Sequence, residues 1–302
     1  MSMSLVCSRI GGRFQLKTKI SSGSFGTWYI SPSLSCSCSL QVSLEHEVTI
    51  YKNLGRMPSI PRAPWFGAED GYNVLVLDLL GPLLASSPLG NEPVFRLQAV
   101  LAISNQMVRS LDIKPSSFLF GPDLLSQKVF LVDFGLAKQY WDPIQHSHIP
   151  YRDGLQLTGT ALWASINVHV GIEHLRRDDI ESLAYIIIYL LHGYLPWQDL
   201  TVDVAIFQRK QSLSPTALCL DLPVGLTAFV AYICSLPFVA DPNYLYLHCL
   251  LQTATERVSS ESKPACTGRP YNGKGSRRPL TGEGSGYGFG KKQAGVVYAD
   301  IS

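Results

Sequence analysis

The chain has 302 residues, of which 46% are hydrophobic and only 16% are charged, with 25 Lys and Arg against 23 Asp and Glu. This length can bury one large core or two small ones, and the near-balance of charge excludes a globally basic nucleic-acid binder and an acidic, wholly disordered protein. No apolar run reaches the roughly 18 residues that a membrane-spanning helix needs, so we predict a globular protein without a membrane span.

The first third of the chain is predicted to be rich in β-strands. Residues 12–30 and 72–78 alternate β-branched or aromatic residues with polar ones, and Gly and Ser punctuate them. Between two of these strand-like runs lies KISSGSFG (19–26), a loop rich in Ser and Gly. Taken alone, the loop is explained equally well by a hairpin turn and by a phosphate-binding loop.

Helical periodicity dominates from Leu97 onward. We predict helices at residues 97–108, 178–193, 223–236 and 241–252. The second of these is apolar on almost every face and ends at Gly193, a pattern typical of a helix buried inside a large helical domain. The sequence therefore predicts an α+β protein, with a small β-rich part followed by a larger α-helical part.

The last 50 residues differ in composition from the rest of the chain. Residues 253–302 contain nine Gly, eight Lys or Arg and four Asp or Glu. Such a segment cannot bury enough apolar surface to offset its ordering entropy, so we predict a disordered, Gly/Ser-rich basic tail from Thr253. A basic tail could touch nucleic acid or acidic lipid, but a solvated appendage is the simpler expectation.

The seven cysteines are an odd number and show no C-x-x-C spacing. The start of the chain, MSMSLVCSRIGG, lacks the shape of a secretory signal. We therefore expect reduced thiols and a location in the cytoplasm or the nucleus. Cys36 and Cys38 could form half of a metal site, but no second Cys or His pair lies nearby in the sequence, so we predict none there.

Two acidic motifs flank a short strand-like run, Val129 to Val132. Asp112-Ile-Lys114-Pro precedes it, and Asp133-Phe-Gly follows it directly. Phosphoryl transfer from ATP needs a carboxylate that orients the accepting hydroxyl, a lysine that neutralises the moving phosphoryl group and a second carboxylate that holds Mg²⁺. Asp112, Lys114 and Asp133 fit these roles in order. Two surface carboxylates in loops would explain either motif alone.

Longer segments around these motifs resemble the casein kinase 1 family of serine/threonine protein kinases. YNVLVLDLLGP (72–82) is similar to that family's hinge segment, LVDFGLAKQY (131–140) to its magnesium loop and HSHIPYRD (146–153) to its activation segment. LTGTALWASINVHVGIEHLRRDDIESLAY (157–185) is similar over its whole length. The similarity of HSHIPYRD (146–153) also accounts for His146 and His148, whose spacing alone would suggest a metal site.

The resemblance covers about residues 9 to 250 and implies a two-lobed protein-kinase-like fold. A truncated, β-rich N-lobe would span residues 9–80 and a larger α-helical C-lobe residues 81–252. The implied activity is ATP-dependent phosphorylation of Ser or Thr in protein substrates, with ATP and Mg²⁺ as cofactors and the protein as a monomer. No specific nucleic-acid partner is implied.

The resemblance also implies individual site residues. Asp112 matches the catalytic base, Lys114 the lysine two residues on, and Asp133 the metal ligand. The residues implied in nucleotide binding are Gly23, Ser24 and Gly26 over the phosphates, Ile20 against the adenine, Leu77 as gatekeeper, and the backbones of Asp78 and Leu80 at the purine edge. Glu47 matches the regulatory-helix glutamate, and Asp179 the aspartate that ties the catalytic loop to the buried helix.

Several positions depart from the family pattern. Residues 31–44 contain no Lys or Arg, although the family carries there, on one of two strands, the lysine that grips the α- and β-phosphates. We therefore expect a damaged sheet and a Glu47 without an ionic partner. Ser116 and Ser117 stand where the family has Asp-Asn, and a hydroxyl is a poorer magnesium ligand than the amide carbonyl of Asn.

Further departures affect the catalytic loop and the substrate site. Ser110 and Leu111 replace the His-Arg before the catalytic Asp, and the preceding segment is shorter by roughly eleven residues, which should misplace Asp112 or expose core. Ser21 replaces the first glycine of the phosphate loop, and Trp28 replaces a small β-branched residue. Leu162 replaces an arginine that helps to hold an anion, which leaves Arg209 and Lys210 as the basic pair after Leu200.

Three hypotheses follow. The chain is a serine/threonine kinase whose activity is impaired by the lost lysine and asparagine, or a pseudokinase that keeps the fold and binds a partner protein. The third is a product that does not fold, because the chain lacks residues in two places, before Glu47 and before Asp112, where the family has secondary structure.

Overall fold

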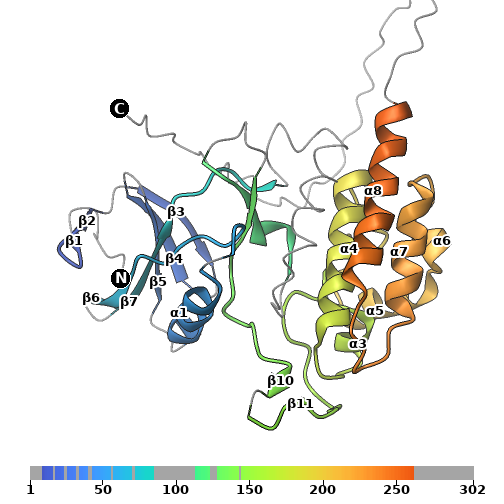
Figure 1. Cartoon of the computed structure of the whole chain (residues 1–302), viewed down its shortest axis with the longest axis horizontal. Coiled ribbons are helices and arrows are strands. Elements are labelled where there is room, and N and C mark those ends of the chain that lie inside the picture. Colours follow the sequence, from blue (N-terminus) through green and yellow to red (C-terminus); the bar gives the residue numbers. More distant parts are fainter. Residues whose placement is uncertain are drawn as a thin grey trace, which may run out of the picture.

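The computed structural model describes the following parts of the chain: residues 9–15, 18–23, 26–31, 34–39, 43–55, 57–69, 72–84, 113–122, 128–142 and 144–261. The predicted helix at 97–108 and the predicted site residues Ser24 and Asp112 lie outside them. The described elements form an α+β fold in which the sheet comes first along the chain and most of the helices follow (Figure 1).

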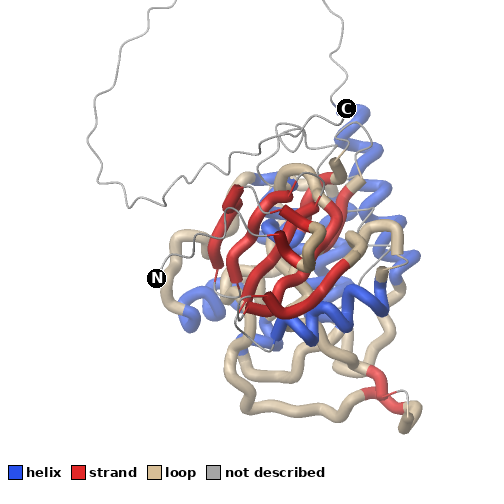
Figure 2. The backbone as a smooth tube through the Cα atoms, turned by 90° about the vertical axis from the view of Figure 1, so that its left-hand side faces the viewer, coloured by secondary structure: helices blue, strands red, loops and turns tan. Residues whose placement is uncertain are grey.

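A five-stranded antiparallel sheet makes up most of the first part. Its spatial order is β3 (Thr18–Gly23), β4 (Gly26–Ser31), β5 (Leu34–Ser39), β7 (Tyr72–Asp78) and β6 (Trp65–Glu69). A hairpin of β1 (Arg9–Ile10) and β2 (Phe14–Gln15) precedes it. Helix α1 (Ser43–Leu54) follows β5 and lies beside the sheet (Figures 1 and 2), with Leu44, Val48 and Tyr51 buried.

The expectation of a damaged sheet is wrong for the described strands. Residues 34–39, the segment without a lysine, form β5, which pairs along its length with β4 on one side and with β7 on the other. The physical reason is the strict alternation of Leu34, Cys36 and Cys38 with serines, which has the period of a strand and needs no charged residue. The sheet is therefore continuous through β5, although this strand lacks the lysine that the family carries.

Two short strands lie between the sheet and the helices. A 3₁₀ turn (Pro115–Ser117) leads into β8 (Phe118–Phe120), which pairs antiparallel with β9 (Val129–Leu131). The chain leaving β7 runs along β8, because the Gly81 N–H donates to the Phe120 carbonyl and the Phe120 N–H donates to the Pro82 carbonyl. A side chain on Gly81 would lie 2.5 Å from the Gly121 carbonyl oxygen, so this close approach requires glycine.

The second part of the chain is helical. Its elements are the hairpin β10 (Trp141–Asp142) and β11 (Ser147–His148), then α3 (Ile166–His169), α4 (Arg176–His192), α5 (Asp203–Ser212), α6 (Pro215–Leu218), α7 (Val224–Cys234) and α8 (Tyr244–Glu261). In Figure 1 the hairpin projects away from the body of the molecule. No helix in the described part of the chain combines the length and apolar character needed to cross a membrane.

The helix predictions at 178–193, 223–236 and 241–252 are confirmed, with one correction. Helix α4 is buried on nearly every face, and Gly193 ends it with a φ of 82°, a left-handed conformation that favours glycine. Helix α8 continues to Glu261, so the predicted tail boundary at Thr253 lies inside a helix. The reason is that no Gly or Pro occurs between Thr253 and Pro264 to end the helix, and Ala254 is fully buried.

One hydrophobic cluster connects the sheet side of the molecule with the helices. It contains Leu75 and Leu77 of β7, Tyr51 of α1, and Phe134 after β9. The same cluster continues through most of α4 and reaches Leu251 and Ala254 of α8. The elements that hold the candidate site are therefore parts of a single core.

Candidate nucleotide site

Asp133 and Lys114 are brought together by the β8–β9 pair. Lys114 directly precedes the 3₁₀ turn, and Asp133 lies two residues after β9. The Val132 N–H donates to the Ser117 carbonyl at 3.0 Å, which fixes one segment against the other. The Lys114 Nζ lies 3.1 Å from Asp133 Oδ2, and both side chains remain partly exposed. Two of the three residues predicted to carry chemistry thus form an ion pair, and the third, Asp112, lies outside the described residues.

The backbone of Asp133 has a left-handed conformation with a φ of 72°. Residues other than glycine adopt this region at a cost, and such residues concentrate at functional sites. Two contacts from α1 hold the conformation. The Asp133 N–H donates to the Tyr51 hydroxyl at 3.3 Å, and the Phe134 N–H donates to Glu47 Oε1 at 3.2 Å. The Phe134 ring also packs edge-to-face on Tyr51, with a centroid distance of 5.0 Å.

Glu47 is a buried carboxylate beside Asp133. A Cβ built on Gly135 would lie 3.9 Å from both Glu47 Oε2 and Asp133 Oδ1, so the two carboxylates border the same small space. Burial, and secondly the charge of Asp133, raise the pKa of Glu47 from 4.5 to about 7, although hydrogen bonds from Phe134 and Tyr51 oppose the rise. No cation contributes to this shift within the described part of the chain.

The predicted nucleotide-binding residues occupy two places in the sheet. Ile20 and Gly23 lie on β3, and Gly23 pairs with Gly26 at the start of β4. Leu77 is buried on β7. The Asp78 N–H donates to the Arg62 carbonyl, while the Asp78 carboxylate forms an ion pair with the Arg62 guanidinium at 2.9 Å. Leu80 follows in the segment that runs to β8.

Ser117 stands at the position where the resemblance places a second metal ligand. The residue is fully buried, and its Oγ has no hydrogen-bond partner in the described part of the chain. Its backbone is bonded on both sides, because its N–H donates to the Lys114 carbonyl and its carbonyl accepts from Val132. The described residues contain no group of three His, Cys, Asp or Glu side chains that could hold a metal ion.

Asp179, predicted to tie the catalytic loop to α4, accepts a hydrogen bond from His174 Nε2 at 2.7 Å. Both side chains are buried. Burial alone would lower the pKa of His174, but the Asp179 carboxylate outweighs it and raises that pKa above the ordinary value. Sequence reasoning missed His174, although it lies only five residues before its partner.

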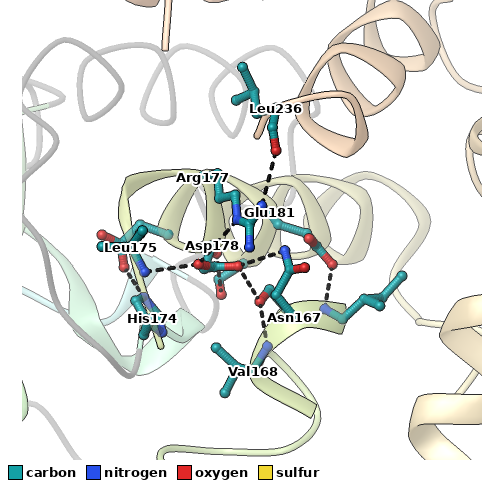
Figure 3. A network of polar contacts seen from close by, with 12 residues as sticks. Asn167, Val168, His174, Leu175, Arg177, Asp178, Glu181 and Leu236 are labelled. Carbon is teal, nitrogen blue, oxygen red and sulfur yellow. Dashed lines mark hydrogen bonds and ion pairs between the residues drawn. The ribbon is translucent and has the colours of Figure 1, made fainter. Parts of the chain in front are cut away.

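The N-terminal end of α4 also holds the start of α3 (Figure 3). Asp178 accepts hydrogen bonds from the Ser165 hydroxyl, the Asn167 amide and the Leu175 N–H at 2.7 to 3.0 Å. Glu181 accepts from the Ile166 N–H at 2.8 Å and from the Tyr185 hydroxyl at 2.5 Å. The sequence signal for this network is the acidic start of a helix that is otherwise apolar.

His146 and His148 belong to no group of side chains that could hold a metal ion in the described part of the chain. His148 packs between Tyr140 and Phe238, and its Nδ1 lies 2.8 Å from the Ile149 carbonyl oxygen. His146 lies in the turn of the β10–β11 hairpin with a φ of 48°.

No known protein-family model matches the chain.

The chemistry available to the arrangement is limited and specific. A partly exposed carboxylate, Asp133, can coordinate a hard cation, and the Lys114 ammonium can neutralise an anionic group next to it. The backbone that carries Asp133 is fixed from behind by Tyr51 and Glu47. These properties suit a phosphate-bearing ligand with its metal ion.

Proposed function

We propose that the chain is a degenerate casein kinase 1-like domain that binds a nucleotide beside Asp133 and transfers phosphate to proteins weakly. The observation that carries the proposal is the strained, doubly held backbone of Asp133 with its carboxylate on Lys114. The residues of the candidate site fit ATP and Mg²⁺ in part. Asp133 would hold the metal, Lys114 would face the phosphates, and the 78–80 backbone would meet the base.

The remaining residues argue for slow chemistry. No cation neutralises Glu47 in the described part of the chain, and a serine hydroxyl stands at the second metal position. Loss of one preorganised electrostatic contact typically slows a reaction by about 10² to 10³. Two such losses, if independent, lower a typical kinase turnover of about 1 to 100 s⁻¹ to roughly 10⁻² to 10⁻⁶ s⁻¹.

The second candidate function is a pseudokinase scaffold that binds a partner protein without phosphotransfer. The observation that favours it is Glu47 itself, because a buried carboxylate with a pKa of about 7 is largely protonated in mildly acidic solution and is then a poor ligand for a lysine. In this case the fold is retained and the nucleotide site is a remnant.

A pair of measurements on the full chain separates these functions. Thermal melts with and without Mg-ATP report binding, and radiolabelled ATP with a casein-like acceptor reports transfer. We expect a stabilising shift and trace transfer in the wild type, both lost in Asp133→Ala, and transfer alone lost in Asp112→Asn. Asp199→Ala, an exposed aspartate between α4 and α5, is the matched control.

The results have distinct consequences. A stabilising shift without transfer favours the scaffold, and turnover near 1 s⁻¹ that disappears in Asp112→Asn means that another cation replaces the lost lysine. No cooperative melt at all supports the third hypothesis, a chain that does not fold. A shift that survives in Asp133→Ala contradicts the proposed site.

A further inference from the structure

Lys210 of α5, one of the basic pair that remains after Leu200, is buried. Only 3% of the residue is exposed. Its Nζ donates hydrogen bonds to the Ala161 carbonyl at 2.9 Å and to the Ala164 carbonyl at 2.6 Å, and His169 Nε2 lies 3.3 Å away. An ammonium has three N–H donors and no acceptor, and the two carbonyls bind two of these donors. His169 Nε2 also lies 3.0 Å from the Ala161 carbonyl oxygen, so the ring tautomer decides whether Nε2 donates to that oxygen or accepts from Lys210. Lys210 is therefore unavailable to bind an external anion.

Aromatic rings and a carboxylate surround the same ammonium. Nζ lies 4.8 Å from the ring centre of Tyr185 and 5.2 Å from that of Trp197, within the range of cation–π attraction. The Glu181 carboxylate raises the pKa of Lys210, but burial is the larger effect and lowers it from 10.5 to about 7. Burial, followed by the charge of Lys210, also lowers the pKa of His169 to about 4, so this ring is neutral beside the ammonium.

The side chains around Lys210 come from α3, α4, α5 and α7. The titratable groups among them are His169, Glu181, Tyr185 and Cys234, and Asp203 of α5 interacts electrostatically with His169. Lys210, Glu181, Tyr185 and Cys234 also line a small pocket between these helices.

The carbonyls that Lys210 binds belong to one backbone segment, Thr160–Ser165. The carbonyl of Leu162, between them, accepts a hydrogen bond from Trp197 Nε1 at 2.9 Å. This segment follows an exposed stretch, residues 150–156 and 158–160, in which Tyr151 and Leu155 present apolar surface. The Leu155 N–H donates to the Gly171 carbonyl, which connects the stretch to the end of α3.

We propose that Lys210 is a positioning residue whose positive charge, rather than its bulk, holds Thr160–Ser165 in shape. The two carbonyls lose their charged donor when the ammonium loses its proton. The Thr160–Ser165 segment is therefore held more firmly in mildly acidic solution, where Lys210 is charged, than in mildly alkaline solution.

The first test needs neither nucleotide nor substrate. Hydrogen exchange of amides 160–169 is compared in the wild type, Lys210→Met, Lys210→Arg and the exposed neighbour Arg209→Met. We expect about tenfold faster exchange in Lys210→Met, while the arginine variant and the control stay near the wild type. Unchanged exchange in Lys210→Met overturns the proposal.

A second measurement keeps the proposal testable if Lys210→Met does not fold. Tryptophan fluorescence of the wild type is titrated from pH 5.5 to 9, because Trp197 lies beside the ammonium. We expect a step with a midpoint near 7 that persists in Arg209→Met and is absent from Lys210→Arg, whose guanidinium stays charged throughout. A wild type without such a step contradicts the proposal.

Discussion

Replacing Glu47 by Gln should stabilise the protein at neutral and alkaline pH. The carboxyl is 8% exposed and its pKa is raised from 4.5 to about 7, first by burial and then by Asp133. A carboxyl with a raised folded-state pKa keeps its proton in the native state while the unfolded chain releases it. Native stability therefore falls as pH rises from about 4.5 to 7 and stays lower above that range.

The size of the effect follows from the shift. One pKa unit corresponds to about 1.4 kcal/mol, so a rise from 4.5 to about 7 lowers the free energy of unfolding by about 3 kcal/mol above pH 7. Glutamine keeps an oxygen that can accept the Phe134 N–H, and it carries no charge to bury beside Asp133. Its gain over the wild type should be near zero at pH 4.5 and about 3 kcal/mol at pH 8.

Urea unfolding of both proteins between pH 4.5 and 8 measures this difference. Glu45→Gln, on the exposed side of the same helix, is the matched control and should show a flat difference. A destabilised Glu47→Gln at pH 8 would refute the reasoning, because it would mean that Glu47 is ionised there and paired with a cation from a part of the chain that the structure does not describe.

Two further substitutions test the helical part. Ile187→Lys places a charge on a residue of α4 that is 1% exposed, so we expect a loss of at least about 4 kcal/mol in thermal or urea unfolding, against little change for the exposed Val204→Lys; an unchanged melting temperature would remove α4 from the core. His174→Gln removes one hydrogen-bond donor to buried Asp179 and should lower stability by about 1 to 3 kcal/mol. Because the pKa of His174 is raised, the wild-type advantage should be complete below about pH 6.5 and decline as pH rises through the folded-state pKa, so an advantage that grows with pH would contradict the pairing.

Hydrophobic patterning was sufficient for the elements of the described fold that lie deepest. Helix α4 and strand β7 are buried because their sequences are nearly continuous apolar runs, and this is visible without any structure. Strand β5 was misjudged for a different reason. The absence of one lysine was interpreted as damage to the sheet, although a strand depends on backbone pairing and alternation, which serines and cysteines satisfy.

The candidate site was predictable only in part, because spacing along the chain does not specify which polar groups meet. Lys114 and Asp133 do meet, and Glu47 lies beside Asp133. Tyr51 was missed, although it is four residues after Glu47 and thus on the same face of α1. The burial of Lys210 was missed, because its carbonyl partners lie more than forty residues earlier and leave no pattern in the sequence.

The acidic first turn of α4 has a consequence for how this sequence can vary. On most surface helices such acids complement the helix dipole and can be exchanged singly with little effect. Here Asp178 accepts hydrogen bonds from Ser165 and Asn167 and also from the Leu175 N–H, while Asp179 accepts from His174. Glu181, in the next turn, accepts from Ile166, which lies between Ser165 and Asn167. A shift of the Asp178 carboxylate by a single methylene therefore breaks contacts in two segments at once. Mutational tolerance should therefore be lowest in this turn, and viable changes should arise as coordinated pairs.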